Sequence, residues 1–368
     1  MVQGKERGRR VLLSADRPNI RLGDPALGGA ELAEVAAVLE SGMLTTGPKV
    51  AEFEAEIARA CGVRHALAVS SGTAALHLAV LAFGLEPGDE VLVPAYTFPA
   101  TGNVVALAGL KPVLVDVDPE TMNVDPARIE VGPRTRLLLG VHLFGRPLRL
   151  HELPELPLLE DAAGALGARY RGRPCGGLGV AGCLSFHPRK IVTTGEGGAV
   201  TTDDDAFAAE VAQLRNHGWR TLSPPDMPAP GLNYRLSDIL CAVGLPQARR
   251  LDELHAARSR VARGYTERLA HLDVLLPRAD EGDLHGWQAY VIQVDDRDRV
   301  LAGLRSEGIE AQIGTYALNL LGAYRDQGAF PGAVRVYERA LALPFHTRIG
   351  ETDLDRVGEA LDRLVSHH

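Results

Sequence analysis

Lysine is scarce in this chain, and one lysine lies in a segment suited to covalent chemistry. The 39 basic residues include only four lysines, which are Lys5, Lys49, Lys111 and Lys190. Lys190 follows the strand-like run C-L-S-F, after which Pro188 prevents a simple continuation of the strand and glycines permit close backbone approach. A lysine amine can lose its proton and condense with an aldehyde, whereas a guanidinium stays protonated. Because this chain otherwise uses arginine for positive charge, Lys190 is predicted to do chemistry.

Two other segments carry groups that could anchor a ligand beside this lysine. The segment S-S-G-T-A-A places Gly72, Thr73 and Ala74 at the start of a predicted helix, where unsatisfied backbone N–H groups can hold a phosphate. Asp161 closes the apolar run L-P-L-L-E-D. Taken alone, each segment is more often an ordinary helix cap.

Together with Lys190 and the hydroxyl of Ser185, these groups match the needs of pyridoxal 5'-phosphate (PLP). The aldehyde of PLP condenses with a lysine, its phosphate is held by N–H groups and a hydroxyl, and an aspartate keeps its pyridine nitrogen protonated. Phe98, in P-A-Y-T-F-P, offers a ring to stack on the pyridine. A formal G-x-G-x-x-G from Gly177 to Gly182 precedes a strand instead of opening a helix, so dinucleotide binding is rejected.

Seven short apolar runs predict the strands that position these residues. They span residues 65–70, 90–96, 112–117, 136–144, 156–162, 182–186 and 198–202. Several runs lack polar residues, as strands buried on both faces do. We therefore expect an α/β domain around a mostly parallel sheet, with its ligand at the carboxyl ends of the strands.

The length of 368 residues predicts about two domains. We expect a poorly ordered tail over residues 1–20, a large α/β domain over 21–250 and a smaller α+β domain over 251–368. A helix is predicted from about residue 237 to 257 or beyond. The C-terminal part adds helical patterns at 256–269, 298–307 and 351–366 and a strand within 288–294.

Composition and motifs exclude several classes of protein. The chain is 46% hydrophobic and 23% charged, which is typical of globular proteins, and its net charge of −8 argues against general binding to nucleic acid or anionic membranes. The four cysteines form no C-x-x-C pair and no H-E-x-x-H occurs, so neither a disulfide framework nor a metal site is expected. With no signal peptide or transmembrane segment found, we expect a cytoplasmic protein.

Several longer motifs follow one another from about residue 20 to 260. They are S-G-M-L-T-T-G-P-K-V-A-E-F-E, S-S-G-T-A-A-L-H-L-A, P-G-D-E-V-L-V-P-A-Y-T-F, V-H-L-F-G, E-D-A-A, S-F-H-P-R-K, T-T-G-E-G-G and G-L-N-Y-R-L-S-D. In this order they resemble the motifs of the DegT/DnrJ-type nucleotide-sugar aminotransferases, which have PLP fold type I. The resemblance implies a three-layer large domain with a seven-stranded sheet and a smaller C-terminal domain.

The resemblance also implies roles for particular residues. Lys190 would bind the cofactor covalently, Asp161 would pair with the pyridine nitrogen, and Phe98 would stack on the ring. The phosphate would be held by Gly72, Thr73, Ala74 and Ser185. Asn233 would reach the phosphate of the neighbouring subunit's cofactor, which implies a homodimer with shared active sites.

Some positions depart from the family pattern. Gly164 and Leu166, in E-D-A-A-G-A-L-G, stand where the family usually has Gln and His, and Gly164 removes a side chain that normally lies by the cofactor. In the C-terminal part, W-Q-A-Y and I-G-T-Y-A-L replace the W-H-x-Y and V-H-Y motifs of many members. Because these regions shape the substrate pocket, the reaction type is better supported than the substrate.

The resemblance implies an aminotransferase that takes an amino group from glutamate or glutamine, holds it as pyridoxamine 5'-phosphate, and passes it to a keto-sugar nucleotide in amino-sugar biosynthesis. A keto-cyclitol is an alternative acceptor. A regulatory homologue that only binds PLP or a sugar nucleotide is a second alternative, although no catalytic residue is lost. A sugar dehydratase of the same fold would carry histidine in place of Lys190.

Overall fold

The computed structural model describes residues 19–365 of the chain. The tail predicted over residues 1–20 therefore lies outside the described residues, except for its last two. Ile20, one of these two, is buried and pairs with Ile309 in a parallel bridge. Within the described range, no helix is long and apolar enough to cross a membrane, and no group of three or more His, Cys, Asp or Glu side chains is arranged to hold a metal ion.

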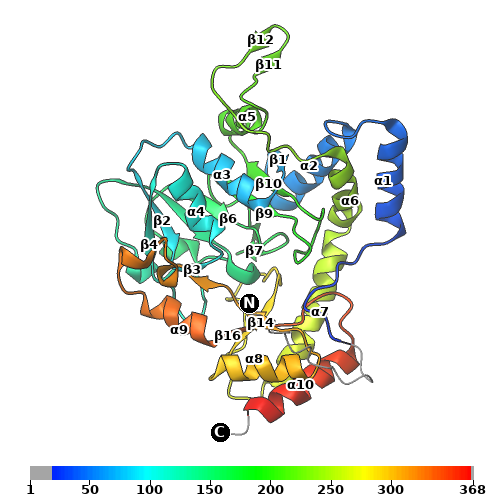
Figure 1. Ribbon diagram of the computed structural model, residues 1–368, viewed down its shortest axis with the longest axis vertical. Helices are drawn as coiled ribbons and strands as arrows, with labels where there is room; N and C mark the ends of the chain where they lie inside the picture. Colours follow the sequence, from blue (N-terminus) through cyan, green and yellow to red (C-terminus); the bar gives the residue numbers. More distant parts are fainter. Residues whose placement is uncertain (1–18, 366–368) are drawn as a thin grey trace, which may run out of the picture.

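A sheet of seven strands forms the centre of the molecule (Figure 1). The order across the sheet is β1-β10-β9-β6-β5-β2-β4. Strand β10 runs antiparallel to both β1 and β9, and the remaining neighbouring pairs are parallel. The strands are β1 (His65–Val69), β2 (Glu90–Pro94), β4 (Lys111–Val115), β5 (Thr135–Val141), β6 (Leu158–Asp161), β9 (Ala181–Ser185) and β10 (Gly198–Thr202). The prediction of an α/β fold around a mostly parallel sheet is confirmed.

Helices cover both faces of this sheet, which gives the three layers of the large α/β unit. Successive residues of a strand point to opposite faces. Leu67 and Val69 of β1 accordingly join the core on the side of α3, whereas Ala66 and Ala68 join the core on the side of α2 and α6. The helices of this part are α1 (Gly29–Ser41), α2 (Pro48–Cys61), α3 (Gly72–Ala82), α4 (Ala100–Leu107), α5 (Asp205–Leu214) and α6 (Asp238–Arg249).

The single helix predicted from about residue 237 to 257 is wrong, because the structure has two helices there. Helix α6 ends at Arg249 and α7 (Leu251–Leu269) begins two residues later. Arg250 leaves helical geometry at φ −109° and ψ 27°. Its guanidinium donates to the backbone oxygen of Ala26 at 2.6 Å and to Glu31 at 2.9 Å. These contacts tie the junction of the two helices to α1 and the residues before it.

A smaller sheet lies at the bottom of the view in Figure 1. It is antiparallel, with β16 (Ala340–Leu343) between β13 (Tyr290–Gln293) and β14 (Gln312–Ile313). Helices α7, α8 (Arg297–Ser306) and α10 (Glu351–Val365) enclose a separate apolar core with it, which includes Tyr265, Ile292 and Leu361. The C-terminal part is therefore α+β, as predicted for its helices and its first strand.

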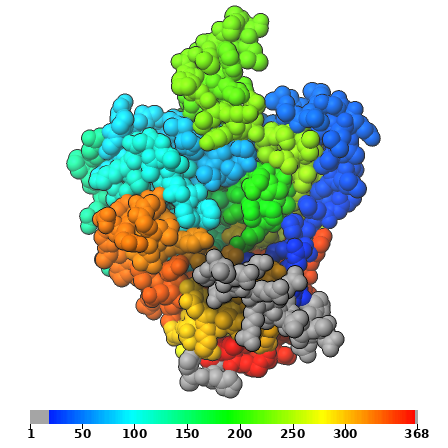
Figure 2. All heavy atoms as spheres, in the orientation of Figure 1, coloured from blue at the N-terminus to red at the C-terminus, as the bar shows by residue number. Residues whose placement is uncertain are grey.

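Part of the C-terminal half returns to the large α/β unit and forms a separate two-stranded sheet there. Strand β15 (Tyr316–Ala317) pairs with β3 (Tyr96–Thr97), and the hydroxyl of Tyr324 donates to Asn103 at 2.7 Å. Helix α9 (Pro331–Arg339), which the sequence analysis did not predict, follows this segment, and Figure 2 shows its orange atoms lying against the cyan atoms of the large α/β unit. The division at residue 250 stays a prediction.

Two short hairpins complete the structure. Strands β7 (Arg169–Tyr170) and β8 (Arg173–Pro174) follow β6 in sequence. Strands β11 (Thr221–Leu222) and β12 (Pro225–Asp226) form the hairpin that stands out at the top of Figure 1. This second hairpin lies in the Pro-rich segment between α5 and α6.

Candidate active site

A pocket opens at the carboxyl ends of the central strands, where the fold places ligands. It brings together residues that are far apart in the sequence. Those predicted from the sequence are Gly72, Thr73, Phe98, Asp161, Ser185 and Lys190. Two other predicted residues lie outside its lining: Ala74, which is buried in α3, and Asn233, which is exposed.

Lys190 lies in the turn that leaves β9. Its N–H donates to the backbone oxygen of His187 at 2.8 Å, and its own backbone oxygen accepts from Arg258 at 3.1 Å. Burial lowers the pKa of the Lys190 ammonium to about 8, and the charge of Asp161 only partly opposes this shift. At this pKa about a tenth of the amine is uncharged at pH 7, far more than in an ordinary lysine, and the uncharged form is the one that attacks a carbonyl carbon.

Asp161 is the last residue of β6 and is buried in the floor of the pocket. One carboxylate oxygen accepts from the hydroxyl of Thr101 at 2.8 Å, and the other accepts from the N–H of Ala163 at 3.1 Å. The hydroxyl of Thr101 also lies 3.0 Å from that of Thr97. Burial raises the pKa of Asp161, while these hydrogen bonds oppose the shift. Among residues 19–365, no basic side chain forms an ion pair with Asp161, so a cation brought by a ligand would find a buried, oriented carboxylate.

The start of α3 offers donors to the same pocket. Ser71 caps the helix, and its hydroxyl oxygen accepts from the N–H of Ala74 at 3.0 Å. The N–H groups of Gly72 and Thr73 have no acceptor among the described residues. A Cβ atom at Gly72 would lie 2.8 Å from the Cβ of Ser185, so glycine is what allows the helix to start beside that serine. Two N–H groups and one hydroxyl therefore converge at a helix N-terminus, where an anion is favoured.

Phe98 stands at the rim of the pocket. Its side chain is 60% exposed, and its ring meets the ring of Tyr316 edge to face at 6.4 Å between centroids. Tyr316 also lines the pocket and belongs to β15. The rim is thus built by two segments that are more than two hundred residues apart in the chain.

The glycine-rich segment that contains the formal G-x-G-x-x-G donates backbone hydrogen bonds to a carboxylate of the protein itself. Glu160 accepts from the N–H groups of Gly176 at 2.7 Å, Leu178 at 2.6 Å and Gly179 at 2.8 Å. The imidazole Nε2 of His142 lies 2.8 Å from Glu160, and its Nδ1 accepts from a backbone N–H, so Nε2 carries the proton and donates. This buried pair joins β6 to the end of β5 directly beside Asp161.

Comparison with known proteins places this architecture in a family. The sequence profile of the DegT/DnrJ/EryC1/StrS aminotransferase family matches residues 25–362. The chain belongs to this family. It is 38% identical over 371 residues to GDP-perosamine synthase of Caulobacter vibrioides, and the alignment covers 95% of this chain and 100% of that protein.

Solved structures of sugar aminotransferases have the same fold. DesV of S. venezuelae matches with a TM-score of 0.91 at 33% identity, over 96% of this chain and 100% of that chain. DesI, solved with its TDP-sugar product, matches with a TM-score of 0.89 at 36% identity, over 96% of this chain and 94% of that chain. The predictions of an aminotransferase, of PLP as its cofactor and of PLP fold type I are confirmed.

The residues of the pocket fit PLP. Asp161 presents a buried carboxylate with no cationic partner among the described residues, which suits a protonated pyridine nitrogen. The free N–H groups of Gly72 and Thr73 suit a phosphate, and the lowered pKa of Lys190 suits an amine that binds an aldehyde.

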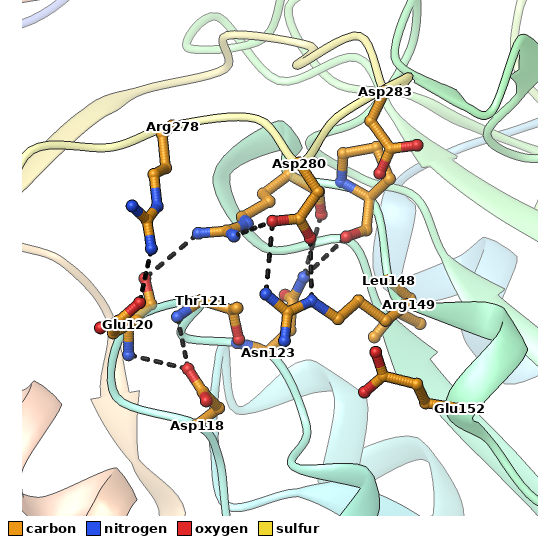
Figure 3. A network of polar contacts seen from close by, with 12 residues as sticks. Asp118, Glu120, Thr121, Asn123, Leu148, Arg149, Glu152, Arg278, Asp280 and Asp283 are labelled. Carbon is orange, nitrogen blue, oxygen red and sulfur yellow. Dashed lines mark hydrogen bonds and ion pairs between the residues drawn. The ribbon is translucent and has the colours of Figure 1, made fainter.

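A network of ion pairs links the segment before β13 to the loop after β5, whose residue Phe144 lines the pocket (Figure 3). Asp280, in the segment before β13, accepts from Arg146 at 2.6 Å and from Arg149 at 2.9 Å. Arg278 of the same segment pairs with Glu120 at 2.7 Å. The residues that follow are joined to the loop after β5 by two backbone hydrogen bonds. The N–H of Gly286 donates to the oxygen of Gly145, and the N–H of Gln288 donates to the oxygen of Phe144. The network thus fixes the approach of the C-terminal part to the loop after β5.

Thr101 and Arg258 were not predicted from the sequence, and Gln288 was noted only as part of W-Q-A-Y. Thr101 supports Asp161, Arg258 holds the backbone of Lys190, and Gln288 lines the pocket. The segment P-A-Y-T-F-P-A-T carries Thr97 and Thr101 four residues apart, a spacing that puts both hydroxyls near each other at a helix start. Arg258 lies in α7 with three other arginines, and nothing in its sequence neighbourhood marks it.

Proposed function

We propose that this protein transfers an amino group from glutamate or glutamine to the ketone of a sugar nucleotide, as a step of amino-sugar biosynthesis. The observation that carries the proposal is the placement of Lys190, Asp161 and the start of α3 around one pocket. The curated relative is a GDP-perosamine synthase and DesI was solved with a TDP-sugar product, which supports a nucleotide sugar as the substrate class.

Asp161 and Lys190 have different roles in the proposed reaction. Bound PLP links the substrate nitrogen through its aldehyde and withdraws electrons from the adjoining carbon. Asp161 holds a proton on the pyridine nitrogen, because a buried carboxylate stabilises the cationic form. Lys190, once released from the cofactor, removes the proton from the donor Cα as its free amine and returns it as an ammonium, for which a pKa of about 8 is well suited.

The helix start and the rim position the reactants. The N–H groups of Gly72 and Thr73 and the hydroxyl of Ser185 would hold the phosphate of the cofactor. The ring of Phe98, which is exposed at the rim, would stack on the pyridine ring and so cover the filled pocket. Covering the pocket excludes water, which strengthens the electrostatic contacts inside it.

We also propose a homodimer with shared active sites, as the sequence resemblance implies. Asn233 lies outside the pocket of its own subunit and is exposed, as a residue that reaches into a second subunit must be. A mixture of Lys190→Ala and Asn233→Ala subunits tests this idea. If each pocket needs Asn233 of the partner, hybrid dimers hold one complete site and the mixture regains activity that neither variant has alone. A cytoplasmic location stays a prediction.

Reduction with borohydride tests the proposed role of Lys190. Wild-type protein saturated with PLP and then reduced should yield one modified peptide, with the cofactor on Lys190. The Lys190→Ala variant should show no modification and no turnover. A modified peptide elsewhere in the chain would refute the assignment.

The substrate class needs a separate experiment. The protein is first loaded with an amine by exposure to glutamate, which removes the visible absorption of the aldehyde form. Keto-sugar nucleotides and keto-cyclitols are then added one at a time, and the returning absorption is followed. Return with sugar nucleotides is the expected result, and return with keto-cyclitols alone would overturn the proposed substrate class.

A further inference from the structure

Two positions that depart from the family pattern lie against each other in the structure. Gly164 follows β6 by three residues, and Gln288 precedes β13 by two. A Cβ atom built on Gly164 would lie 3.4 Å from Cβ, 3.5 Å from Cγ and 3.5 Å from Oε1 of Gln288. The side chain of Gln288 therefore occupies the space in front of Gly164 that a longer residue at 164 would need.

The backbone of Gln288 is held firmly on this wall. Its N–H donates to the oxygen of Phe144 at 3.1 Å. Its own oxygen accepts from Arg258 at 3.0 Å, and the same guanidinium donates to the backbone oxygen of Lys190 at 3.1 Å. One buried arginine thus fixes the positions of Gln288 and Lys190 relative to each other.

The side-chain amide of Gln288 is free to bind a ligand. It lines the pocket with Lys190 and Asp161, and it has no hydrogen-bond partner among residues 19–365. By contrast, Gln312, on the same wall, has its amide beside the guanidinium of Arg189. A free amide in the wall of a pocket is a group that a ligand is expected to satisfy.

The chemistry of PLP leaves one polar group for this amide. The aldehyde is taken by Lys190, the pyridine nitrogen by Asp161, and the phosphate by the start of α3 and Ser185, if the proposed function holds. The remaining polar group is the oxygen on ring carbon 3. We propose that the amide of Gln288 donates a hydrogen bond to this oxygen, and that Gly164 leaves the space through which it does so.

The proposal predicts a spectroscopic effect. A hydrogen-bond donor stabilises the ring oxygen as an anion and so lowers the pH at which the lysine-bound cofactor gives up its proton. Removal of the donor in Gln288→Leu, which keeps a branched side chain of similar volume, should raise the pH midpoint of the visible band by about one unit and weaken PLP binding about tenfold. Gln288→Ala should act in the same direction.

Exchange of the two positions supplies the sharpest test. Gly164 does not have a positive φ, and the three atoms nearest to a Cβ at 164 all belong to Gln288, at ordinary van der Waals distances. In the double variant Gly164→Gln, Gln288→Ala, the amide approaches from the opposite element, and both the midpoint and the PLP affinity should return toward wild type. Gln312→Ala, which removes another pocket glutamine, should leave the midpoint unchanged.

The outcomes separate this inference from the proposed function on which it rests. If wild-type protein shows no visible band with PLP, the proposed function fails. If the wild type shows the band but Gln288→Leu and Gln288→Ala keep its midpoint and affinity, the role of Gln288 is overturned. Far-ultraviolet circular dichroism of each variant without PLP verifies that the fold is retained. If Gln288→Ala alone fails to fold, Gln288→Leu and the exchange variant still test the role of Gln288.

Discussion

The lowered pKa of Lys190 has a consequence that can be measured directly. Because burial lowers this pKa to about 8, the uncharged amine prevails above pH 8 and the ammonium below it. The rate at which PLP attaches to cofactor-free protein should therefore rise between about pH 6 and 9 with a midpoint near 8. The measurement is the growth of the visible band after mixing. A rate that keeps rising toward pH 10.5, the usual value for lysine, would contradict the shift.

A second prediction concerns the hydroxyl that supports Asp161. Thr101→Val removes a donor to the carboxylate, so the pKa of Asp161, already raised by burial, should rise further. Activity that needs the carboxylate form is then lost at a higher pH, and the acid limb of kcat/KM should move up by about one pH unit.

Thr97→Val is the matched control for this change. Thr97 contacts the hydroxyl of Thr101 at 3.0 Å, and its hydroxyl has no hydrogen bond to Asp161 among the described residues. Its acid limb should move less than that of Thr101→Val. An equal shift of the acid limb in both variants, or no shift in Thr101→Val, would contradict the role assigned to the Thr101 hydroxyl.

The sequence predicted those site residues that stand at the end of a strand or the start of a helix. Lys190 was recognised by its rarity, and Asp161 by its place after an apolar run. Gln288 was noted only as part of W-Q-A-Y, because the role proposed for it depends on its contact with Gly164, more than a hundred positions earlier. Ala74 was assigned to the phosphate as part of a motif, but its N–H is taken by Ser71.

At the scale of single elements, the start of α3 gives a prediction with a close control. Gly72→Ala places a Cβ 2.8 Å from the Cβ of Ser185, so the helix start or β9 must shift. We expect weaker PLP binding and a loss of about 1–3 kcal/mol in the free energy of unfolding. Isothermal titration with PLP and urea unfolding measure the two effects.

Gly29→Ala is the matched control. Gly29 is the first residue of α1, as Gly72 is of α3, but no atom lies within 4 Å of a Cβ at that position. Its PLP affinity should be unchanged and its stability within about 0.5 kcal/mol of wild type. Equal losses in the two variants would show that the close approach to Ser185 is not the cause.

The strands were predictable because each is a short apolar run bounded by turns. Two features of the C-terminal part were not. Helix α9 has only nine residues and follows a loop, so its pattern gives little signal. The break between α6 and α7 falls at Arg250, four residues after Pro246, and the guanidinium of Arg250 contacts Ala26 and Glu31 there.

At the scale of the whole molecule, Asp280 joins the C-terminal part to the loop after β5. Arg146 is almost fully buried, so Asp280→Asn leaves its charge without a partner and should destabilise the protein by about 2 kcal/mol. The hydrogen bond from Arg149 and the charge of Arg146 lower the pKa of Asp280 to about 2. Because this pKa is below that of an unfolded aspartate, the stabilisation is present above about pH 4 and is lost as pH falls through 2.

The matching measurement is the difference in Tm between wild type and Asp280→Asn. It should be largest near pH 6 and shrink as the pH is lowered below 4. Arg278→Ala is a useful comparison, because its pair with Glu120 is more than half exposed on both sides and should contribute little. A difference in Tm that does not change with pH would rule out the charge of Asp280 as its source.

The pairing of β15 with β3 sets an order on events during protein synthesis. Lys190, Asp161 and the start of α3 have all been translated by residue 190, but Tyr316 pairs with Thr97 and faces Phe98 across the rim. More than a hundred residues must therefore be synthesised after Lys190 before Tyr316 completes the rim of the pocket. A ribosome-bound fragment that ends before Tyr316 should bind PLP weakly. Full PLP binding should begin only when Tyr316 has left the exit tunnel.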